Sequence, residues 1–240
     1  LGGIQLFTIG IVMESLRHLT IEETYELGEA ILDGDLEEVK KELGDLLLHI
    51  VFYAKIGSET DDFDMADVAT DISEKLIRRH PHIYGDISVT GEDEVKANWE
   101  KIKLSEGKKS VLEGVPQSLP ALVKANRIQE KVAGVGFDWE RPEQVLEKVK
   151  EEIGELEREL DKGESEKIES ELGDVLFSLV NYSRFLGINP ENALERTNKK
   201  FMNRFKYLEA RASEAGKSLS EMTLAEMDQF WEAAKSFEHP

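Results

Sequence analysis

One helical pattern occurs twice along the chain, and this repeat limits the folds that are open to it. The segment EETYEL at residues 22–27 returns as EEIGEL at 151–156, and KKELGDLLLHIV at 40–51 returns as ESELGDVLFSLV at 169–180. Both pairs lie 129 positions apart. A constant offset of this kind indicates two copies of one structural unit. We therefore expect an N-terminal unit at residues 13–104, a connector at 105–139 and a C-terminal unit at 140–240.

Apolar residues recur at helical spacing in both copies. They fall three and four positions apart, as in Leu43, Leu46, Leu47, Ile50 and Val51, which is the pattern of an amphipathic helix. Strand alternation with hairpin dipeptides is hard to find anywhere, so we predict an all-α fold. Each copy should form a four-helix-bundle-like unit that carries acids on a helical hairpin. The expected helices cover residues 21–32, 36–55, 65–79, 92–103, 118–132, 143–161, 164–186, 190–215 and 224–235.

Local signals support several of these boundaries. Thr20 is of a type that caps helix N-termini, Pro142 stands at a favourable first-turn position, and Gly187 can end a helix. The first 12 residues, LGGIQLFTIGIV, are apolar, but a bilayer span requires about 20 such residues. We expect an irregular or partly helical lead-in there.

The charge balance is strongly acidic. Asp and Glu number 50 against 30 Lys and Arg, which leaves a formal net charge of −20. Nucleic acids and anionic membranes are therefore unfavourable partners, because both are bound mainly through Lys and Arg. The chain has no cysteine, which excludes disulfides and thiolate metal sites and fits a reducing compartment. We expect a cytoplasmic protein.

Four acids in the first copy are arranged symmetrically about a glycine. They are Glu23, Glu26, Glu42 and Asp45. Glu26 and Glu42 each lie 8 positions from Gly34, and Glu23 and Asp45 each lie 11 positions from it. A helical hairpin that turns at Gly34 would place these acids opposite one another, because residues three apart share a helix face.

The second copy repeats the arrangement about Gly163. Its acids are Glu152, Glu155, Glu171 and Asp174. Packed helices lie roughly 8–10 Å apart, so facing carboxylates can converge on one ion. Each set of four is interleaved with core residues and should lie at the edge of the buried face, where like charges require a cation.

Carboxylate ligands indicate which cation this would be. All-oxygen coordination suits Mg²⁺, with Mn²⁺ as a possible substitute, and leaves positions open for water and phosphate. The lack of Cys and of a Glu-x-x-His pair argues against Zn²⁺ and di-iron sites. The alternative is that acid-rich surface helices form Glu-x-x-Glu pairs by chance, which explains one pair more readily than two matched quartets.

Further sequence blocks identify a family resemblance. EExxE is followed by ELGD, then by KLIRRHPHIYGD, EVKANWEKIK, GVGFDW and NKKFMNRFKYLE, over residues 13–235. Together these blocks resemble the MazG family. The resemblance implies an all-α, Mg²⁺-dependent, homodimeric nucleoside triphosphate pyrophosphohydrolase that releases a nucleoside monophosphate and pyrophosphate. It also implies that the quartet acids are metal ligands and that the basic block at residues 200–204 binds the triphosphate.

A triphosphate needs cationic partners besides a metal ion, because it carries about four negative charges. Lys200 and Arg204 are four apart on one helix face, and Lys167 precedes Glu171 by one turn. Each could instead be a solvated helix residue or the partner of a nearby acid. Trp231 could stack on a base or fill the core, and its recurrence as Trp99 favours a structural role in at least one unit. The complete set of substrate-binding candidates is Lys148, Lys167, Lys200, Asn203, Arg204 and Trp231.

The two quartets are not equivalent. At the offset of 129, Lys167 of the second copy corresponds to Glu38 of the first. We therefore expect Glu152, Glu155, Glu171 and Asp174 to be the catalytic metal ligands of a broad-specificity enzyme, with a weaker metal site in the first copy. Two alternatives remain open at this point, a non-catalytic nucleotide or metal sensor and a helical scaffold whose acids merely bind ions.

Overall fold

The computed structural model describes residues 11–84, 91 and 110–236, and every regular element within these ranges is a helix. The prediction of an all-α fold is confirmed. The chain divides into two compact units, residues 1–111 and 112–240. None of the described helices has the length and apolarity that a membrane span requires.

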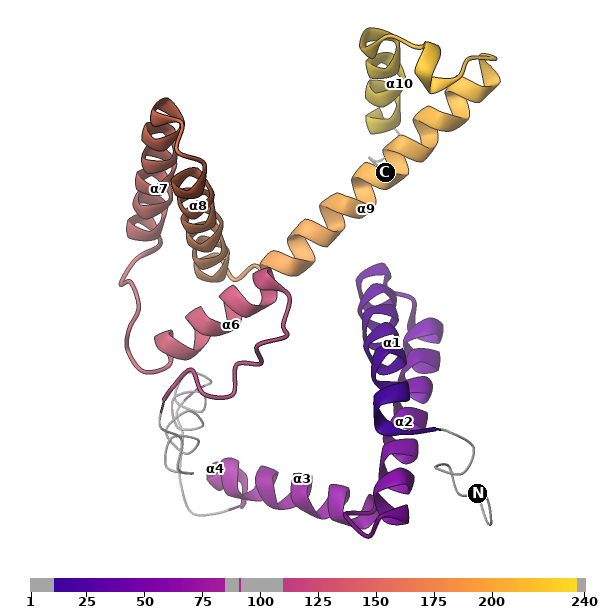
Figure 1. Cartoon of the computed structure of the whole chain (residues 1–240), viewed down its shortest axis with the longest axis vertical. Helices are drawn as coiled ribbons and strands as arrows, with labels where there is room; N and C mark the ends of the chain where they lie inside the picture. The colour runs from indigo at the N-terminus through magenta and orange to yellow at the C-terminus, as the bar shows by residue number, and fades with distance from the viewer. Residues whose placement is uncertain (1–10, 85–90, 92–109, 237–240) are drawn as a thin grey trace. The chain divides into compact units, whose positions relative to one another are not determined.

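The first unit is built on an antiparallel hairpin of α1 (Met13–Asp33) and α2 (Leu36–Glu59), followed by α3 (Met65–Arg79) and α4 (Pro81–Tyr84) (Figure 1). The hairpin turns at Gly34, as predicted, with a φ of 71°. This left-handed conformation favours glycine, because a Cβ atom would be strained there. Asp35 then caps α2, since its carboxylate accepts hydrogen bonds from the backbone N–H groups of Glu37 and Glu38 at 3.1 Å.

The start of α1 differs from the prediction. The helix begins at Met13 rather than near residue 21, with Val12 as its N-cap residue. Ser15 in the first turn bonds back to this residue, because its hydroxyl accepts a hydrogen bond from the N–H of Val12 at 3.0 Å and donates one to the carbonyl of Val12 at 2.7 Å. Thr20 is therefore not a cap. It lies inside the helix, where its hydroxyl donates to the carbonyl of Leu16 at 3.0 Å and lies 2.8 Å from the hydroxyl of Tyr53.

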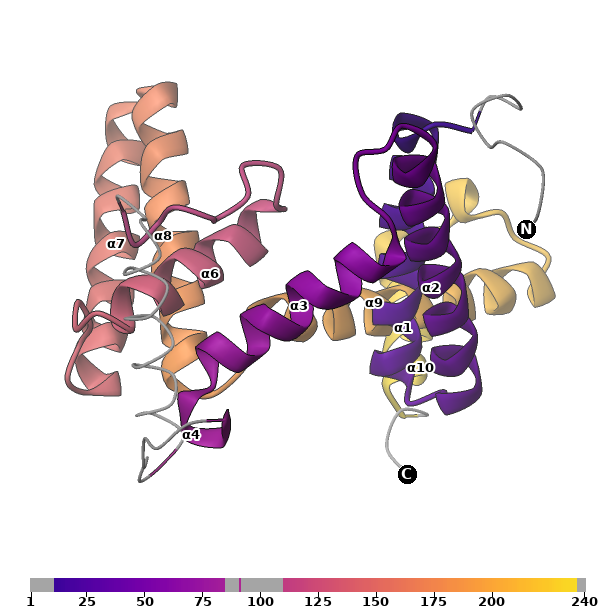
Figure 2. The same ribbon diagram turned by 90° about the horizontal axis from the view of Figure 1, so that it is seen from below.

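The second unit contains a matching hairpin of α7 (Pro142–Lys162) and α8 (Ser165–Phe185), which lie side by side in Figure 2. It turns at Gly163 with a φ of 73°, close to the value at Gly34, and Pro142 occupies the first turn of α7 as predicted. Gly187, with a φ of 69°, follows the end of α8. The remaining elements are α6 (Ala121–Ala133), α9 (Pro190–Glu214), η2 (Leu219–Glu221) and α10 (Leu224–Ser236).

Helix α6 falls within the predicted connector. It packs against α8, and the side-chain amide of Gln129 donates a hydrogen bond to the carbonyl of Phe177 at 2.8 Å. The limits that we assigned to the connector, 105–139, stay a prediction. The helix expected at 92–103, with Trp99, lies outside the described residues.

The hairpins bury one face and leave another open. In the second unit Val145 and Val149 of α7 and Val175 and Val180 of α8 are buried, while Leu16 and Ile56 form a core cluster in the first unit. Large apolar side chains of α8 remain exposed in the single chain, namely Leu172, Leu176 and Leu179.

Candidate active site

The α7–α8 hairpin brings three acids together. Glu152 and Glu155 lie one turn apart on α7, and Glu171 reaches them from α8. One carboxylate oxygen of each lies within 4.8 Å of the others. Asp174 lies outside this group, although its charge contributes to raising the pKa of Glu171. We call Glu152, Glu155 and Glu171 the second acid triad.

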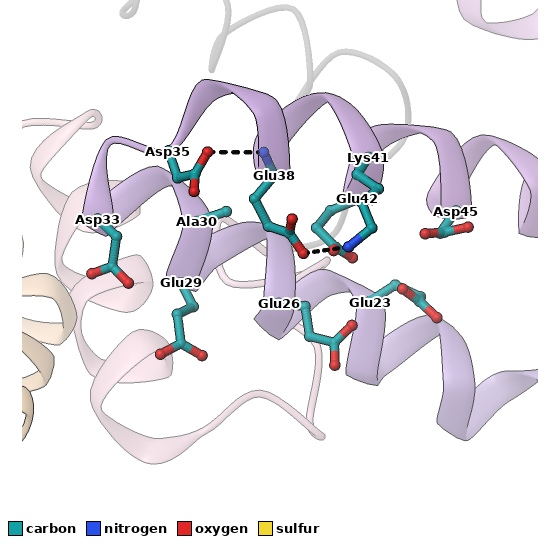
Figure 3. Close-up of a pocket in the computed structure, with 10 residues that line it drawn as sticks. All are labelled: Glu23, Glu26, Glu29, Ala30, Asp33, Asp35, Glu38, Lys41, Glu42 and Asp45. Carbon is teal, nitrogen blue, oxygen red and sulfur yellow. Dashed lines mark hydrogen bonds and ion pairs between the residues drawn. The ribbon is translucent and has the colours of Figure 1, made fainter.

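The first unit contains the same arrangement. Glu23 and Glu26 of α1 meet Glu42 of α2, again with one oxygen of each within 4.8 Å of the others. Asp45 lies outside this group of three, but all four acids line one groove along the α1–α2 hairpin, as Figure 3 shows. We call these three residues the first acid triad. The hairpin symmetry read from the sequence therefore corresponds to real proximity for three acids of each quartet.

Both triads hold a carboxyl group that is poorly suited to carry its charge. Burial, a hydrogen bond with Glu38 and the charges of Glu26 and Glu23 raise the pKa of Glu42 to about 7. Only 4% of Glu42 is exposed, and its Oε2 atom has no hydrogen-bond partner in the described part of the chain. Burial and the charge of Glu155 likewise raise the pKa of Glu171.

This chemistry fits a hard divalent cation. Three converging carboxylates supply oxygen ligands and leave other positions for water and substrate oxygens. A cation would also satisfy the unpartnered oxygen of Glu42 and remove the repulsion that raises these pKa values. The residues therefore match Mg²⁺ or Mn²⁺ by their chemistry, which does not distinguish between the two.

A lysine predicted to bind substrate lies directly at the second acid triad. The ammonium group of Lys148 lies 2.7 Å from Oε1 of Glu152 and 2.9 Å from Oε1 of Glu151. The hydrogen bond with Glu152 is the main reason that the pKa of Lys148 is raised, so the lysine stays charged. Lys148 is therefore a cation next to a metal-ligand candidate.

The contrast between Lys167 and Glu38 is also present in the structure. Lys167 is exposed and pairs with Glu164 at 2.8 Å. Glu38 pairs with Lys41 at 2.7 Å, and this hydrogen bond lowers the pKa of Glu38. The two hairpins thus carry opposite charges at equivalent positions, and each charge is paired with a neighbouring side chain of opposite sign.

The other substrate-binding candidates lie on α9 and α10. The guanidinium of Arg204 lies 5.7 Å from the centre of the Trp231 ring, and the Phe201 ring lies 4.9 Å from it. Lys200 and Asn203 are exposed on the same helix as Arg204. The structure thus joins Arg204 to Trp231. Their action on one substrate stays a prediction.

One ion pair that is not apparent from the sequence fixes a loop of the second unit. Arg184, at the end of α8, donates two hydrogen bonds to the carboxylate of Asp138, at 2.9 and 2.5 Å, and a further one to Asn181 at 2.8 Å. Asp138 belongs to the segment GVGFDW, which is one of the sequence blocks that resemble the MazG family. Its partner Arg184 lies 46 residues away, and no sequence motif indicates this pairing.

The fold and the triads define a class: an all-α protein with two tandem helix hairpins whose carboxylates can hold a divalent cation. Residues 12–84 and 140–208 each match the MazG nucleotide pyrophosphohydrolase domain. The chain belongs to the MazG family, as the resemblance indicated.

Similar proteins span most of the chain. The nucleoside triphosphate pyrophosphohydrolase/pyrophosphatase MazG of Thermotoga maritima is 45% identical over 225 residues, which cover 92% of this chain and 86% of that protein. The nucleoside triphosphate pyrophosphohydrolase of Escherichia coli K12 is 42% identical over 222 residues, or 90% of this chain and 84% of that protein. The uncharacterized protein YabN of Bacillus subtilis is 46% identical over 229 residues, or 94% of this chain and 47% of its own length.

Proposed function

We propose that this chain is a Mg²⁺-dependent hydrolase that converts nucleoside triphosphates and water to nucleoside monophosphates and pyrophosphate. The activity is that named for its relatives in T. maritima and E. coli. The observation that supports the site is the second acid triad, in which three carboxylates from two helices converge next to Lys148. Broad specificity for the base and sugar is part of the proposal.

Different side chains of the second unit would bind the metal ion, neutralise the phosphate charge and accept the proton. Glu152, Glu155 and Glu171, with Asp174 beside them, would hold the metal. Bound Mg²⁺ supplies a Lewis acid for the phosphates and lowers the pKa of a coordinated water. Lys148 and the other basic candidates oppose the triphosphate charge, which matters because charge stabilisation is the main catalytic contribution in phosphoryl transfer.

The proton balance also requires one of these acids. Water attacks a phosphorus of the α–β anhydride link, and the bond between that phosphorus and the bridging oxygen breaks. A carboxylate of the second quartet accepts a proton from the attacking water, as general bases do. The leaving group departs with the electron pair of the broken bond.

The second unit carries the activity in this proposal. Its hairpin presents Lys167 where the first presents Glu38, so an incoming phosphate meets a cation in one unit and an anion in the other. The first acid triad can hold a metal ion of its own, with weaker affinity for any phosphate ligand.

Turnover in two matched variants tests this assignment. Glu171→Gln should remove nearly all pyrophosphate release from a panel of ribo- and deoxyribonucleoside triphosphates, while Glu42→Gln should keep most of it. EDTA should abolish turnover and Mg²⁺ should restore it. Phosphorus NMR should show pyrophosphate as the primary product. Orthophosphate with a diphosphate would contradict the proposed bond, and triphosphate binding without any product would favour a sensor.

We also propose that the chain forms a homodimer in the cytoplasm. The exposed leucines of α8 are the observation in favour, because an apolar helix face of this kind commonly marks an interface. Light scattering at micromolar concentration should give about twice the 27.2 kDa chain mass. A mass equal to that of one chain would overturn the dimer without affecting the proposed reaction.

A further inference from the structure

The first unit carries many more acids than one metal ion can use. An open groove of about 670 Å³ runs along the α1–α2 hairpin, and eight of the ten residues that line it are Asp or Glu (Figure 3). Lys41 is the cation among these ten. Eight carboxylates and one ammonium group leave a formal charge of −7 when all are ionised. The groove therefore selects strongly for positive ligands.

The acids form two rows with the pitch of a helix. On α1 they occur at positions 23, 26, 29 and 33, and on the α2 side at positions 35, 38, 42 and 45. Each step is three or four residues, which is about one turn of 5.4 Å, so each row extends over roughly 15 Å. The first acid triad occupies the part of the groove away from the turn, and the acids at positions 29, 33, 35 and 38 continue toward Gly34.

One oxygen of a buried carboxyl group within the groove lacks a partner. Glu42 is 4% exposed, and its Oε2 atom accepts no hydrogen bond from any described residue. A buried carboxylate oxygen without a donor costs free energy, so native structures normally provide a donor or a cation. This observation is independent of the number of acids, and it points to a positively charged ligand in the groove.

The second copy of the hairpin shows that this charge is not a requirement of the fold. At the offset of 129, Glu29, Asp33 and Glu38 correspond to Arg158, Lys162 and Lys167. Three negative positions near one turn are thus positive near the other. Arg158, Lys162 and Lys167 each pair with an acid of their own hairpin, namely Glu155, Glu159 and Glu164, so this turn is less acidic than the groove of the first unit. The two copies have therefore diverged toward ligands of opposite charge.

We propose that the groove of the first unit binds a linear aliphatic polyamine. Ammonium groups separated by three or four methylenes lie about 5–6 Å apart in an extended chain, which matches the helical pitch that sets the acid rows. Each ammonium group can donate charge-assisted hydrogen bonds to carboxylates of both rows. Mg²⁺ requires compact octahedral ligation at about 2.1 Å and would engage only the triad. A polyamine uses the whole length of the groove.

Calorimetric titration of the full chain with spermidine, in metal-free buffer without nucleotide and at about 0.15 M salt, tests this inference. One spermidine should bind per chain. The triple variant Glu29→Arg, Asp33→Lys and Glu38→Lys, which gives the first hairpin the residues of the second, should weaken binding at least tenfold. A neutral triple variant, Glu29→Gln, Asp33→Asn and Glu38→Gln, should weaken it by a smaller factor. It covers the case in which the charge-reversed protein does not fold.

A matched control separates the groove from the general acidity of the chain. Glu22→Arg, Asp71→Lys and Glu74→Lys change the net charge by the same amount at exposed positions outside the groove, and should alter binding less than twofold. Equal weakening in both triple variants would overturn the proposal. Binding of Mg²⁺ alone to the groove, with no spermidine binding, would also overturn it. Glu171→Gln, which is expected to lose hydrolysis, should keep spermidine binding. The result for spermidine binding therefore does not depend on whether the proposed hydrolysis is correct.

Discussion

Reversing the charge of Lys167 should weaken catalysis by a predictable factor. The side chain is 56% exposed, so its interaction with a phosphate is screened by water. Two unit charges 4 Å apart interact by about 1 kcal/mol in water and by about 4 kcal/mol near a protein surface of effective dielectric 20. The exposure of Lys167 favours the lower value, because exposed ion pairs contribute little.

The size of the effect follows from this value. Loss of the charge in Lys167→Gln removes about 1 kcal/mol, or roughly fivefold in kcat/KM, and reversal in Lys167→Glu removes about 2 kcal/mol, or roughly 30-fold. Pyrophosphate release at substrate concentrations below KM measures the ratio directly. The effect should shrink as salt is raised from about 0.01 to 0.15 M, because screening lengths fall from about 30 to 8 Å.

A charge reversal elsewhere on the same hairpin provides the control. Lys150 lies exposed on α7, two residues from Lys148 and so on a different face of the helix. Lys150→Glu changes the net charge equally but should lower kcat/KM less than threefold. If Lys150→Glu and Lys167→Glu lowered kcat/KM equally, the position of Lys167 on α8 would have no special role, and the contrast between Lys167 and Glu38 would not explain why the second unit is the catalytic one.

Three further predictions concern stability. Glu42→Gln should raise the Tm in EDTA at pH 8 but not at pH 5, because the raised pKa of about 7 in the folded protein means that stability is lost as the pH rises toward this value; Glu22→Gln on the neighbouring helix α1 should leave the Tm unchanged at both pH values. Arg184→Met should lower the Tm, since hydrogen bonds between charged groups contribute about 1.5–3 kcal/mol, whereas an unchanged Tm would show that the Asp138 pair is dispensable. Glu226, whose hydrogen bonds with Lys217 and Thr223 lower its pKa to about 2, stabilises the protein above pH 4.5 and loses this effect toward pH 2, so Glu226→Gln should flatten the acid side of the Tm profile.

The hairpins were predictable because their determinants are local. Gly34 and Gly163 each supply a left-handed turn residue, and helical spacing then fixes which acids share a face. The beginning of α1 was missed for a local reason as well. Ser15, which bonds to the N-cap residue Val12, and Thr20 both carry a hydroxyl group. Such a hydroxyl can bond at a helix start or to the carbonyl four residues earlier, and Thr20 does the latter.

Other features depend on pairs that are far apart in the sequence. The contact between Arg184 and Asp138 and the one between Gln129 and Phe177 join helices through side chains 46 and 48 residues apart. No periodicity encodes such a pair. The same holds for burial: Glu42 and Glu26 have equal standing in the sequence pattern, yet Glu42 is buried and Glu26 is exposed.

Duplication explains why the two acid triads agree in geometry and disagree in charge. The turn glycine and the triad are held by backbone geometry, so both copies keep them. Positions 29, 33 and 38 lie on the groove wall, where a charge reversal leaves the helix intact because Lys and Arg are helix formers as good as Glu and better than Asp. Charge at these positions is thus free to change without loss of the fold. Selection on ligand charge alone is sufficient to turn one hairpin toward phosphate and the other toward cations.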